Sequence, residues 1–146
     1  MGWGTRGLMK YLLDTHVFLW LLGTPYKLGE RVRGELKDPG VTLFVSAASA
    51  FEIALKTRLG KLPGESIVRN WDKALSDISA LPLSISPELA LHAGGMQWGH
   101  RDPFDRLLVA QAVGEEITLV TADHVILRLR DDKSREYGTA IRSALV

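Results

Sequence analysis

The segment Lys10-Tyr-Leu-Leu-Asp-Thr-His-Val-Phe-Leu-Trp20 decides the fold class of this chain. Its first apolar run, Tyr11 to Leu13, is short and ends at the carboxylate of Asp14, which predicts a buried strand that stops there. A second apolar run, Val17 to Leu22, ends before Gly23 and predicts a short buried helix after the strand. A strand that leads straight into a helix is the repeating unit of α/β proteins.

The same alternation of strand and helix continues along the rest of the chain. Pro82 lies in one of the strands, and this places that strand near a sheet edge. Alternating strands and helices favour a parallel sheet with right-handed crossovers, so the expected fold is an α/β sandwich. Further strands are predicted over 41–45, 81–85 and 117–121. Helices are predicted over 27–37, 46–60, 66–78, 86–95, 102–114 and 123–129, and Phe51 is expected on the apolar side of the helix over 46–60. No element is assigned after residue 130.

Length and composition limit the class of protein. With 146 residues the chain suits one domain, which we place at 10–146 after an N-terminal extension of residues 1–9. The chain has no cysteine, which excludes disulfides, thiol nucleophiles and cysteine-ligated zinc. The formal charge of +1 excludes a polybasic tail. The longest apolar run has far fewer than the ~20 residues of a membrane span, so we expect a cytoplasmic protein.

Five acidic residues stand at positions where function is expected. Asp14 and Asp123 follow the first and last predicted strands, and sites in open α/β sheets form beyond the carboxyl ends of strands. Glu52 lies among apolar residues of its helix, while Asp102 and Asp105 share one face at the start of another. Asp102 before Pro103 also fits a helix cap, and Asp105 and Asp123 suit the first turn of a helix. Asp14 is harder to explain structurally, because a buried unpaired charge costs several kcal/mol.

Carboxylates that converge in this way favour a metal site. Two like charges ~4 Å apart repel by about 4 kcal/mol at an effective dielectric of 20, so a cation or a proton must compensate them. Oxygen ligands without histidine or cysteine suit Mg²⁺ or Mn²⁺. Such an ion binds a phosphodiester oxygen and lowers the pKa of a bound water. His92, His100 and His124 lack the spacing of metal ligands.

Four ordered segments resemble the motifs of PIN-domain ribonucleases, specifically the VapC-type toxins of toxin–antitoxin pairs. They cover most of residues 10–130: the opening segment 10–20, the segment 46–56 with Gly60-Lys61-Leu62, the segment 100–112, and Leu119-Val-Thr-Ala-Asp123. The resemblance implies a PIN-like three-layer α/β/α sandwich with a central, mostly parallel sheet. It also implies an endoribonuclease that uses Mg²⁺, or Mn²⁺ in its place.

The resemblance implies roles for particular residues as well. Asp14, Glu52, Asp105 and Asp123 form the acidic, metal-binding set, with Asp102 as an adjunct and Ser46 and Thr121 in support. Asp105 is chosen over Asp102 because it precedes the apolar helix pattern of the third motif.

Contacts to RNA and to partner proteins are expected near the acidic set. Arg101 and Arg106 flank that set and are candidates to hold a phosphate, although they also suit a pair with Asp102. Trp98 lies in a polar loop and is a candidate for stacking on an RNA base. The resemblance to such toxins implies a partner antitoxin that inserts an Arg or Lys side chain among the carboxylates. Trp20 and Trp71 are candidates to contact an amphipathic helix of this antitoxin. The resemblance also implies a homodimer. Apolar surface for its interface is expected from Phe18, Trp20, Leu21 and Leu22.

Two other classes of protein remain open. One is a PIN-like module that binds RNA or protein without cleaving it, although the complete acidic set argues against it. The other is an acidic pocket that accepts a phosphoryl group. An aspartate-nucleophile phosphatase needs a second Asp two residues after the first, where this chain has His16. A receiver module needs an acidic pair after its first strand and a Lys after its last, and neither is present.

Overall fold

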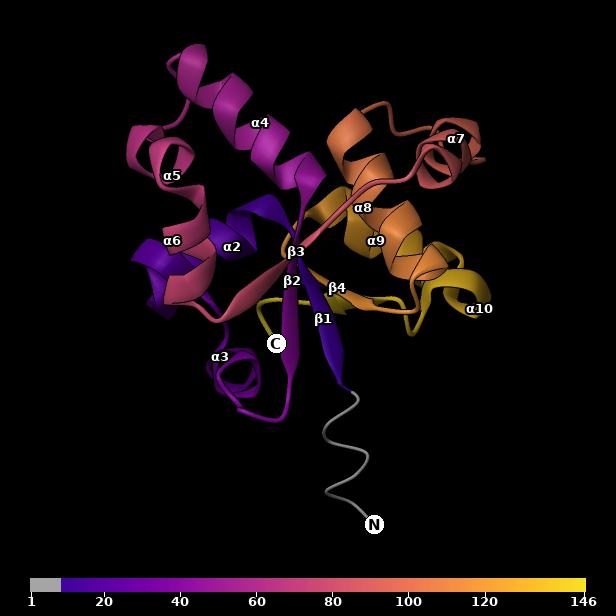
Figure 1. Ribbon diagram of the computed structural model, residues 1–146. Helices are drawn as coiled ribbons and strands as arrows, with labels where there is room; N and C mark the ends of the chain where they lie inside the picture. The colour runs from indigo at the N-terminus through magenta and orange to yellow at the C-terminus, as the bar shows by residue number, and fades with distance from the viewer. Residues whose placement is uncertain (1–8) are drawn as a thin grey trace.

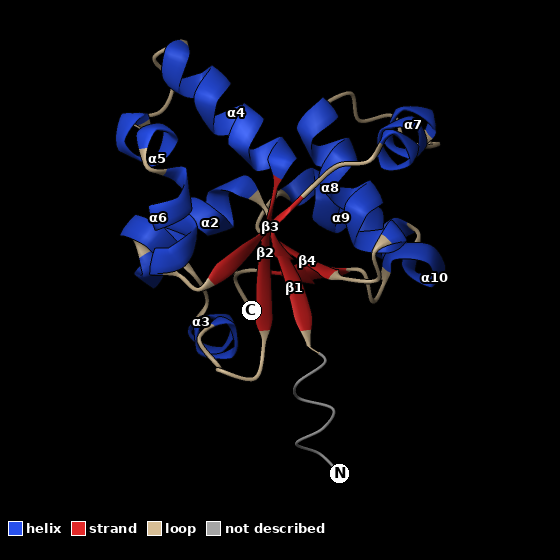
Figure 2. Cartoon of the chain, in the orientation of Figure 1, coloured by secondary structure: helices blue, strands red, loops and turns tan. Residues whose placement is uncertain are grey.

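A twisted parallel sheet runs through the middle of the molecule (Figures 1 and 2). The structure is a computed structural model that describes residues 9–146, so residues 1–8 of the expected N-terminal extension lie outside the described part. All strand pairs in the sheet are parallel, as the sequence predicts. The strand order is β3-β2-β1-β4-β5, with β1 at Lys10–Leu13, β2 at Thr42–Ser46, β3 at Ala80–Leu83, β4 at Thr118–Thr121 and β5 at Ile141–Ser143.

The central strand β1 marks the point where the chain changes direction across the sheet. It pairs with β2 on one side, where Leu13 is opposite Val45, and with β4 on the other, where Leu13 is opposite Val120. The carboxyl ends of these three strands therefore meet at one edge. The backbone N–H of Asp14 donates to the Val120 carbonyl over 3.1 Å and joins the ends of β1 and β4. Ligands of open α/β sheets bind at such a switch point.

Helices cover both faces of the sheet, and this confirms the three-layer sandwich (Figure 2). No helix of the described residues is long and apolar enough to cross a membrane. One face of the sheet is covered by α2 (Thr15–Gly23), the 3₁₀ turn η1 (Pro25–Lys27), α3 (Glu30–Leu36), α5 (Glu65–Arg69) and α6 (Trp71–Asp77). The other face is covered by α7 (Pro87–Gly95), α8 (Pro103–Gly114), α9 (His124–Asp132) and α10 (Ser134–Tyr137). Helix α4 (Ala47–Arg58) extends from the carboxyl end of β2.

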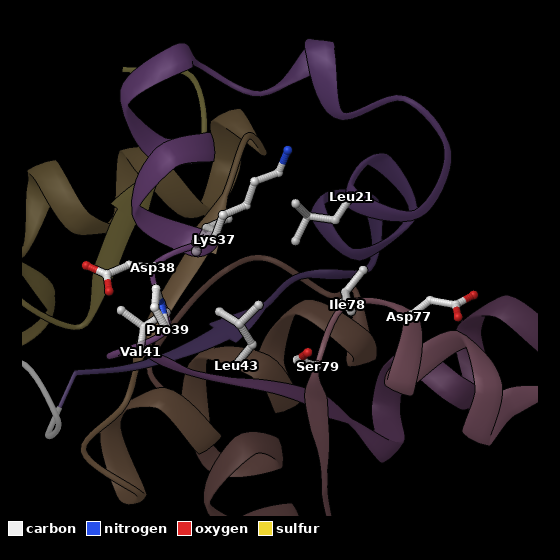
Figure 3. A pocket seen from close by; sticks show the side chains of 10 residues that line it. Leu21, Lys37, Asp38, Pro39, Val41, Leu43, Asp77, Ile78 and Ser79 are labelled. Atoms are coloured by element: carbon white, nitrogen blue, oxygen red, sulfur yellow. The ribbon is translucent and has the colours of Figure 1, made fainter.

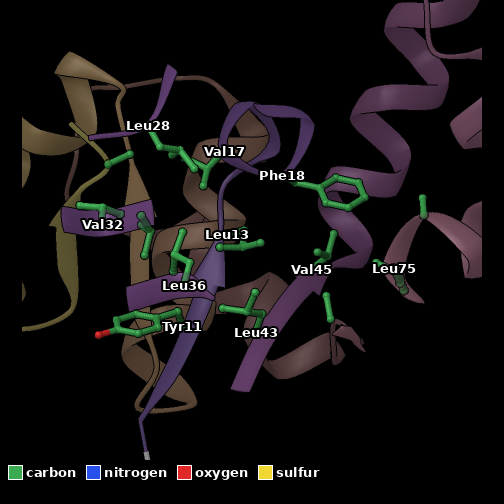
Figure 4. Packing of buried hydrophobic residues seen from close by; sticks show 14 of the residues in the cluster. Tyr11, Leu13, Val17, Phe18, Leu28, Val32, Leu36, Leu43, Val45 and Leu75 are labelled. Atoms are coloured by element: carbon green, nitrogen blue, oxygen red, sulfur yellow. The ribbon is translucent and has the colours of Figure 1, made fainter. Parts of the chain in front are cut away.

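Two hydrophobic cores hold the layers together, one on each face. Successive side chains of a strand point to opposite faces, so Leu13 lies in the first core and Leu12 in the second, and both are fully buried. Figure 4 shows the first core, to which α2 contributes Phe18, α3 contributes Val32 and β2 contributes Val45. Because β1 is covered on both sides, its sequence is a continuous apolar run rather than an alternating one.

The structure corrects several sequence-based expectations. The helix expected over 27–37 is shorter, because η1 and a break precede α3. The helix expected over 66–78 is two helices, since Asn70 has φ −125° and ψ 53°, outside the helical region. Phe51 is 63% exposed rather than on a buried face, and its ring packs against Phe104 of α8 at a centroid distance of 5.7 Å. Phe18 is fully buried in its own core, so the prediction that it contributes to a dimer surface is wrong.

The chain after residue 130 forms elements that sequence analysis does not predict. Helix α9 continues to Asp132, α10 follows, and β5 joins the sheet beside β4. Strand β5 has only three residues, and Arg142 lies between its two buried side chains, Ile141 and Ser143. A strand this short, with a charged residue at its centre, produces no apolar run in the sequence. Arg142 forms an ion pair with Glu35 of α3 at 2.7 Å.

Candidate active site

All five predicted acidic residues line one small pocket at the carboxyl edge of the sheet. Its volume is about 80 Å³. The first turns of α2, α8 and α9 meet here, together with one side of α4. Asp14, Asp102 and Asp123 cap the three helices, so the positive ends of their dipoles lie beside the carboxylates. This acidic pocket is lined by Asp14, Thr15, His16, Glu52, Lys56, Asp102, Asp105, Leu108 and Asp123.

Asp14 is held at the end of β1 by hydrogen bonds to both of its carboxylate oxygens. Oδ1 accepts from the Val17 backbone N–H at 2.9 Å, and Oδ2 accepts from the Thr121 hydroxyl. The residue is only 6% exposed. Burial raises the pKa of Asp14, and the hydrogen bonds from Thr121 and Val17 oppose this rise. A carboxylate in this setting gains from a nearby cation.

Thr121, at the end of β4, connects two of the acidic residues. Its hydroxyl donates to Asp14 and accepts from the backbone N–H of Asp123 at 3.0 Å. Asp123 in turn caps α9, because its Oδ1 accepts from the backbone N–H groups of Val125 and Ile126 at 2.8 and 3.1 Å. These contacts fix Asp14 and Asp123 relative to each other across the ends of neighbouring strands.

The start of α8 supplies the other two aspartates. Asp102 caps this helix, and its Oδ1 accepts from the backbone N–H groups of Phe104 and Asp105 at 2.8 and 3.1 Å. Asp105 Oδ2 lies 2.7 Å from Nε2 of His100. Burial raises the pKa of Asp105 to about 6, the His100 hydrogen bond lowers it, and the charges of Asp102 and Asp123 raise it.

Glu52 reaches the pocket from α4 and is bound on both of its oxygens. Oε1 accepts from the Thr15 hydroxyl at 2.6 Å, and Oε2 accepts from the Lys56 ammonium at 2.5 Å. Ser49 Oγ lies 2.9 Å from the Thr15 oxygen and continues this chain of contacts. The Glu52 side chain is therefore both buried and paired.

The donor set fits a hard divalent cation. Carboxylate oxygens are the ligands that Mg²⁺ and Mn²⁺ prefer, and five carboxylates line this pocket. Burial, together with neighbouring negative charges, raises the pKa values of two of them, Asp14 and Asp105. One ligand atom from each of His100, Asp102 and Asp105 lies within 4.8 Å of the others, close enough to share an ion. His100 thus belongs to the site, which its spacing in the sequence does not predict.

The remaining predicted site residues lie around the pocket rather than in it. Ser46 caps α4 by accepting from the Ala48 N–H at 2.9 Å, and Arg101 is exposed. Trp98 is partly buried against the second core, and its ring centroid lies 4.9 Å from that of His100.

Arg106 has a role that sequence analysis does not predict. Its guanidinium donates to the backbone carbonyls of five residues that end α7 and form the loop to α8: Ala93, Gly94, Met96, Trp98 and His100. An arginine side chain has five N–H donors, so none is left for a phosphate in this arrangement. Arg106 instead shapes the loop that carries His100 to Asp105.

Four residues that line the pocket are absent from the sequence-based set: Thr15, His16, Lys56 and Leu108. His100, which contacts Asp105 from the loop before α8, is absent from it as well. Lys56 is four residues after Glu52 on one helix, and this spacing is a recognised signal for an ion pair. Thr15 and His100 carry no comparable signal, because their contacts depend on how α2 packs on α4 and on the path of the loop before α8.

A larger cavity lies away from the acidic residues, at the amino ends of β2 and β3 (Figure 3). Its volume is about 530 Å³. Leu21 of α2, Leu43 of β2 and Ile78 give it apolar walls, and Lys37 and Asp77 lie at its rim. It shares no residue with the acidic pocket, so its size alone does not make it the functional site.

The fold and the pocket define an α/β protein with an acidic site at the switch point of a parallel sheet. The family model of the PIN domain matches residues 11–132, and the chain belongs to the PIN-domain family. A comparison with curated proteins finds no match. The fold is similar to a chain in the crystal structure of VapBC2 from Rickettsia felis bound to a DNA fragment from their promoter, with 17% identity, a TM-score of 0.58, and coverage of 92% of this chain and 98% of that chain.

Proposed function

We propose that this protein is a metal-dependent endoribonuclease and the toxin of a toxin–antitoxin pair. The observation that carries the proposal is the convergence of five carboxylates in one pocket of a PIN-domain chain. The described part of the pocket contains no cysteine or serine placed as a nucleophile, and its donor set suits a cation. Phosphodiester hydrolysis is the chemistry that such a site favours.

In this proposal Asp14, Asp105 and Asp123 hold a Mg²⁺ ion, for which Mn²⁺ can substitute, and Asp102 and Glu52 complete the acidic set. When bound, such an ion would polarise the phosphodiester and lower the pKa of a water molecule. Around it, Thr121 orients Asp14 through its hydroxyl, and His100 orients Asp105. Preorganised carboxylates of this kind need not rearrange when the ion binds.

An RNA cleavage assay tests the nuclease. Protein freed of any partner should cut single-stranded RNA with Mg²⁺ or Mn²⁺ and stop in EDTA. Asp14→Asn and Asp105→Asn should abolish cleavage, whereas Asp72→Asn, an exposed aspartate on α6, should not change it. Equal cleavage in EDTA contradicts the proposal. RNA binding without cleavage indicates the silent PIN-like module, and labelling by acetyl phosphate indicates a phosphoacceptor.

The partner in this proposal is a small antitoxin protein. One structural neighbour is a chain from a crystal structure of VapBC2. An Arg or Lys side chain of the antitoxin, inserted into the acidic pocket, would neutralise its carboxylates. Trp20 and Trp71 are partly exposed on the side of α2 and α6 and can receive an apolar helix of this partner. Expression of the chain alone should arrest growth, co-expression of the adjacent small gene should relieve the arrest, and Asp14→Asn should be harmless. Harmless wild-type expression without a partner refutes the toxin role.

The proposal also includes a homodimer in the cytoplasm, where the RNA is. Trp20, Leu21 and Leu22 of α2 remain partly exposed and supply apolar surface for it. Light scattering at micromolar concentration should give twice the mass of the chain, and Leu21→Asp should give a monomer. A wild type that is monomeric in solution would contradict the homodimer and leave the nuclease and toxin proposals unaffected.

A further inference from the structure

Lys56 distinguishes Glu52 from the other carboxylates of the acidic pocket. Within the described residues, Lys56 is the one lysine or arginine that lines this pocket. Its Nζ lies 2.5 Å from Glu52 Oε2. Among the five acidic residues of the pocket, only Glu52 is paired with a lysine or arginine side chain, whereas Asp105 contacts a histidine. The negative charge of Glu52 is therefore already compensated by the chain itself.

The contacts of Glu52 leave it poorly suited to bind a metal ion directly. The Thr15 hydroxyl occupies Oε1 and the Lys56 ammonium occupies Oε2. Direct coordination requires the ion to approach an ammonium group of like charge or to displace it. Asp105 and Asp123 face no such obstacle, since they contact a histidine ring and backbone N–H groups.

An ion pair four residues apart on a helix is often a simple surface feature of little energy. This pair differs, because the Glu52 side chain is 8% exposed and both residues line the pocket. The Lys56 side chain is 32% exposed, so its ammonium lies between the buried carboxylate and solvent. An ammonium has three N–H donors, and the contact with Glu52 leaves others for a ligand.

We propose that Lys56, anchored by Glu52, binds a phosphate oxygen of the RNA, and that the site holds one divalent ion on the side of Asp14, Asp105 and Asp123. This inference rests on the proposed nuclease function and assigns the residues that grip its substrate. In nucleases with two metal ions, the second ion is ~4 Å from the first and also binds the phosphate. Here the ammonium takes the place of that second ion, and lysine is a common phosphate ligand.

Manganese titration tests the metal part without any cleavage. Electron paramagnetic resonance of the full chain with Mn²⁺ should show one bound ion. Glu52→Gln should leave the Mn²⁺ affinity within about threefold of wild type, whereas Asp105→Asn should weaken it by about tenfold or more, as expected for a ligand. Lys56→Met should not weaken it. Two Mn²⁺ ions in the wild type, one of them lost in Glu52→Gln, overturn the proposal.

Cleavage kinetics test the phosphate part. Lys56→Met should reduce kcat/KM on a single-stranded RNA oligonucleotide by about 10- to 100-fold, the loss expected for a hydrogen bond between charged groups. Lys56→Arg keeps the charge and should restore most of the activity, and Lys61→Met, which removes an exposed lysine nearby, should have no effect. The double variant Glu52→Gln/Lys56→Gln avoids an unpaired buried charge and should lose activity in the same way.

The results separate this inference from the nuclease function. A wild type that cleaves RNA while Lys56→Met cleaves equally well overturns the role of Lys56 and leaves the nuclease intact. A wild type that cleaves no RNA overturns the nuclease and the phosphate contact together, and the Mn²⁺ count still decides the number of ions. Thermal melting of each variant verifies that it is folded.

Discussion

Replacing Arg106 with glutamine should destabilise the protein strongly. The guanidinium donates to five carbonyls at distances of 2.7–3.2 Å, and four of these bonds are partly buried. A hydrogen bond to a charged group contributes ~1.5–3 kcal/mol. Water replaces the exposed bond to Gly94 and part of the others, so we count about two full bonds at the lower value, or ~3 kcal/mol. With an unfolding entropy of ~2.1 cal/mol/K per residue, Tm should fall by about 10 °C.

Circular dichroism melting measures this loss. Arg106→Lys should recover less than half of it, because an ammonium cannot reproduce the planar fork of donors. Arg101→Gln, an exposed neighbour, is the matched control and should change Tm by less than about 2 °C, as is usual for surface substitutions. Hydrogen exchange of the loop before α8 should accelerate in Arg106→Gln. A Tm for Arg106→Gln equal to that of the control would refute the view that these bonds hold the loop.

Three further predictions concern the pocket and the backbone. In EDTA, stability should fall as the pH rises from 3.8 to about 6, because burial raises the pKa of Asp105 to about 6 and only the folded state then keeps the proton. Asp105→Asn should remove the fall of Tm between pH 3.8 and about 6. A variant whose Tm falls with pH as steeply as that of the wild type would contradict the assignment to Asp105. Asp14→Asn should raise Tm of the metal-free protein at pH 7, since burial penalises the charged form of Asp14; a lower Tm disproves this. Gly29→Ala should cost ~1–3 kcal/mol in urea unfolding, because a Cβ there overlaps the Leu145 carbonyl, whereas Gly23→Ala meets nothing and should not.

Features with a local cause were predictable from the sequence. Ser46 and Asp102 cap helices as expected, because a cap depends on a side chain and the backbone two or three residues later. The strand before Asp14 and the strand before Asp123 are also where the sequence places them, since buried parallel strands appear as short apolar runs. Pro82 lies on the edge strand β3, as its missing N–H requires.

Features that depend on tertiary packing were not predictable in this way. The apolar spacing over 66–78 suits one helix, but Asn70 interrupts it where α5 turns into α6. Phe51 fits an apolar helix face in sequence, but α4 extends beyond the sheet and leaves the ring exposed beside Phe104. Strand β5 exists because β4 offers an open edge, and three residues with a central Arg142 show no pattern of their own.

The candidate site shows the same division. The sequence by itself determined that the site is acidic, because residue type sets its charge and the alternation of strands and helices brings Asp14 and Asp123 to one edge of a parallel sheet. Only the tertiary structure decided that His100 contacts Asp105, and that Thr15 and Lys56 occupy the two oxygens of Glu52. The physical reason is range: a hydrogen bond requires its atoms within ~3 Å, and the distance between α2 and α4 follows from the packing of both helices on the sheet.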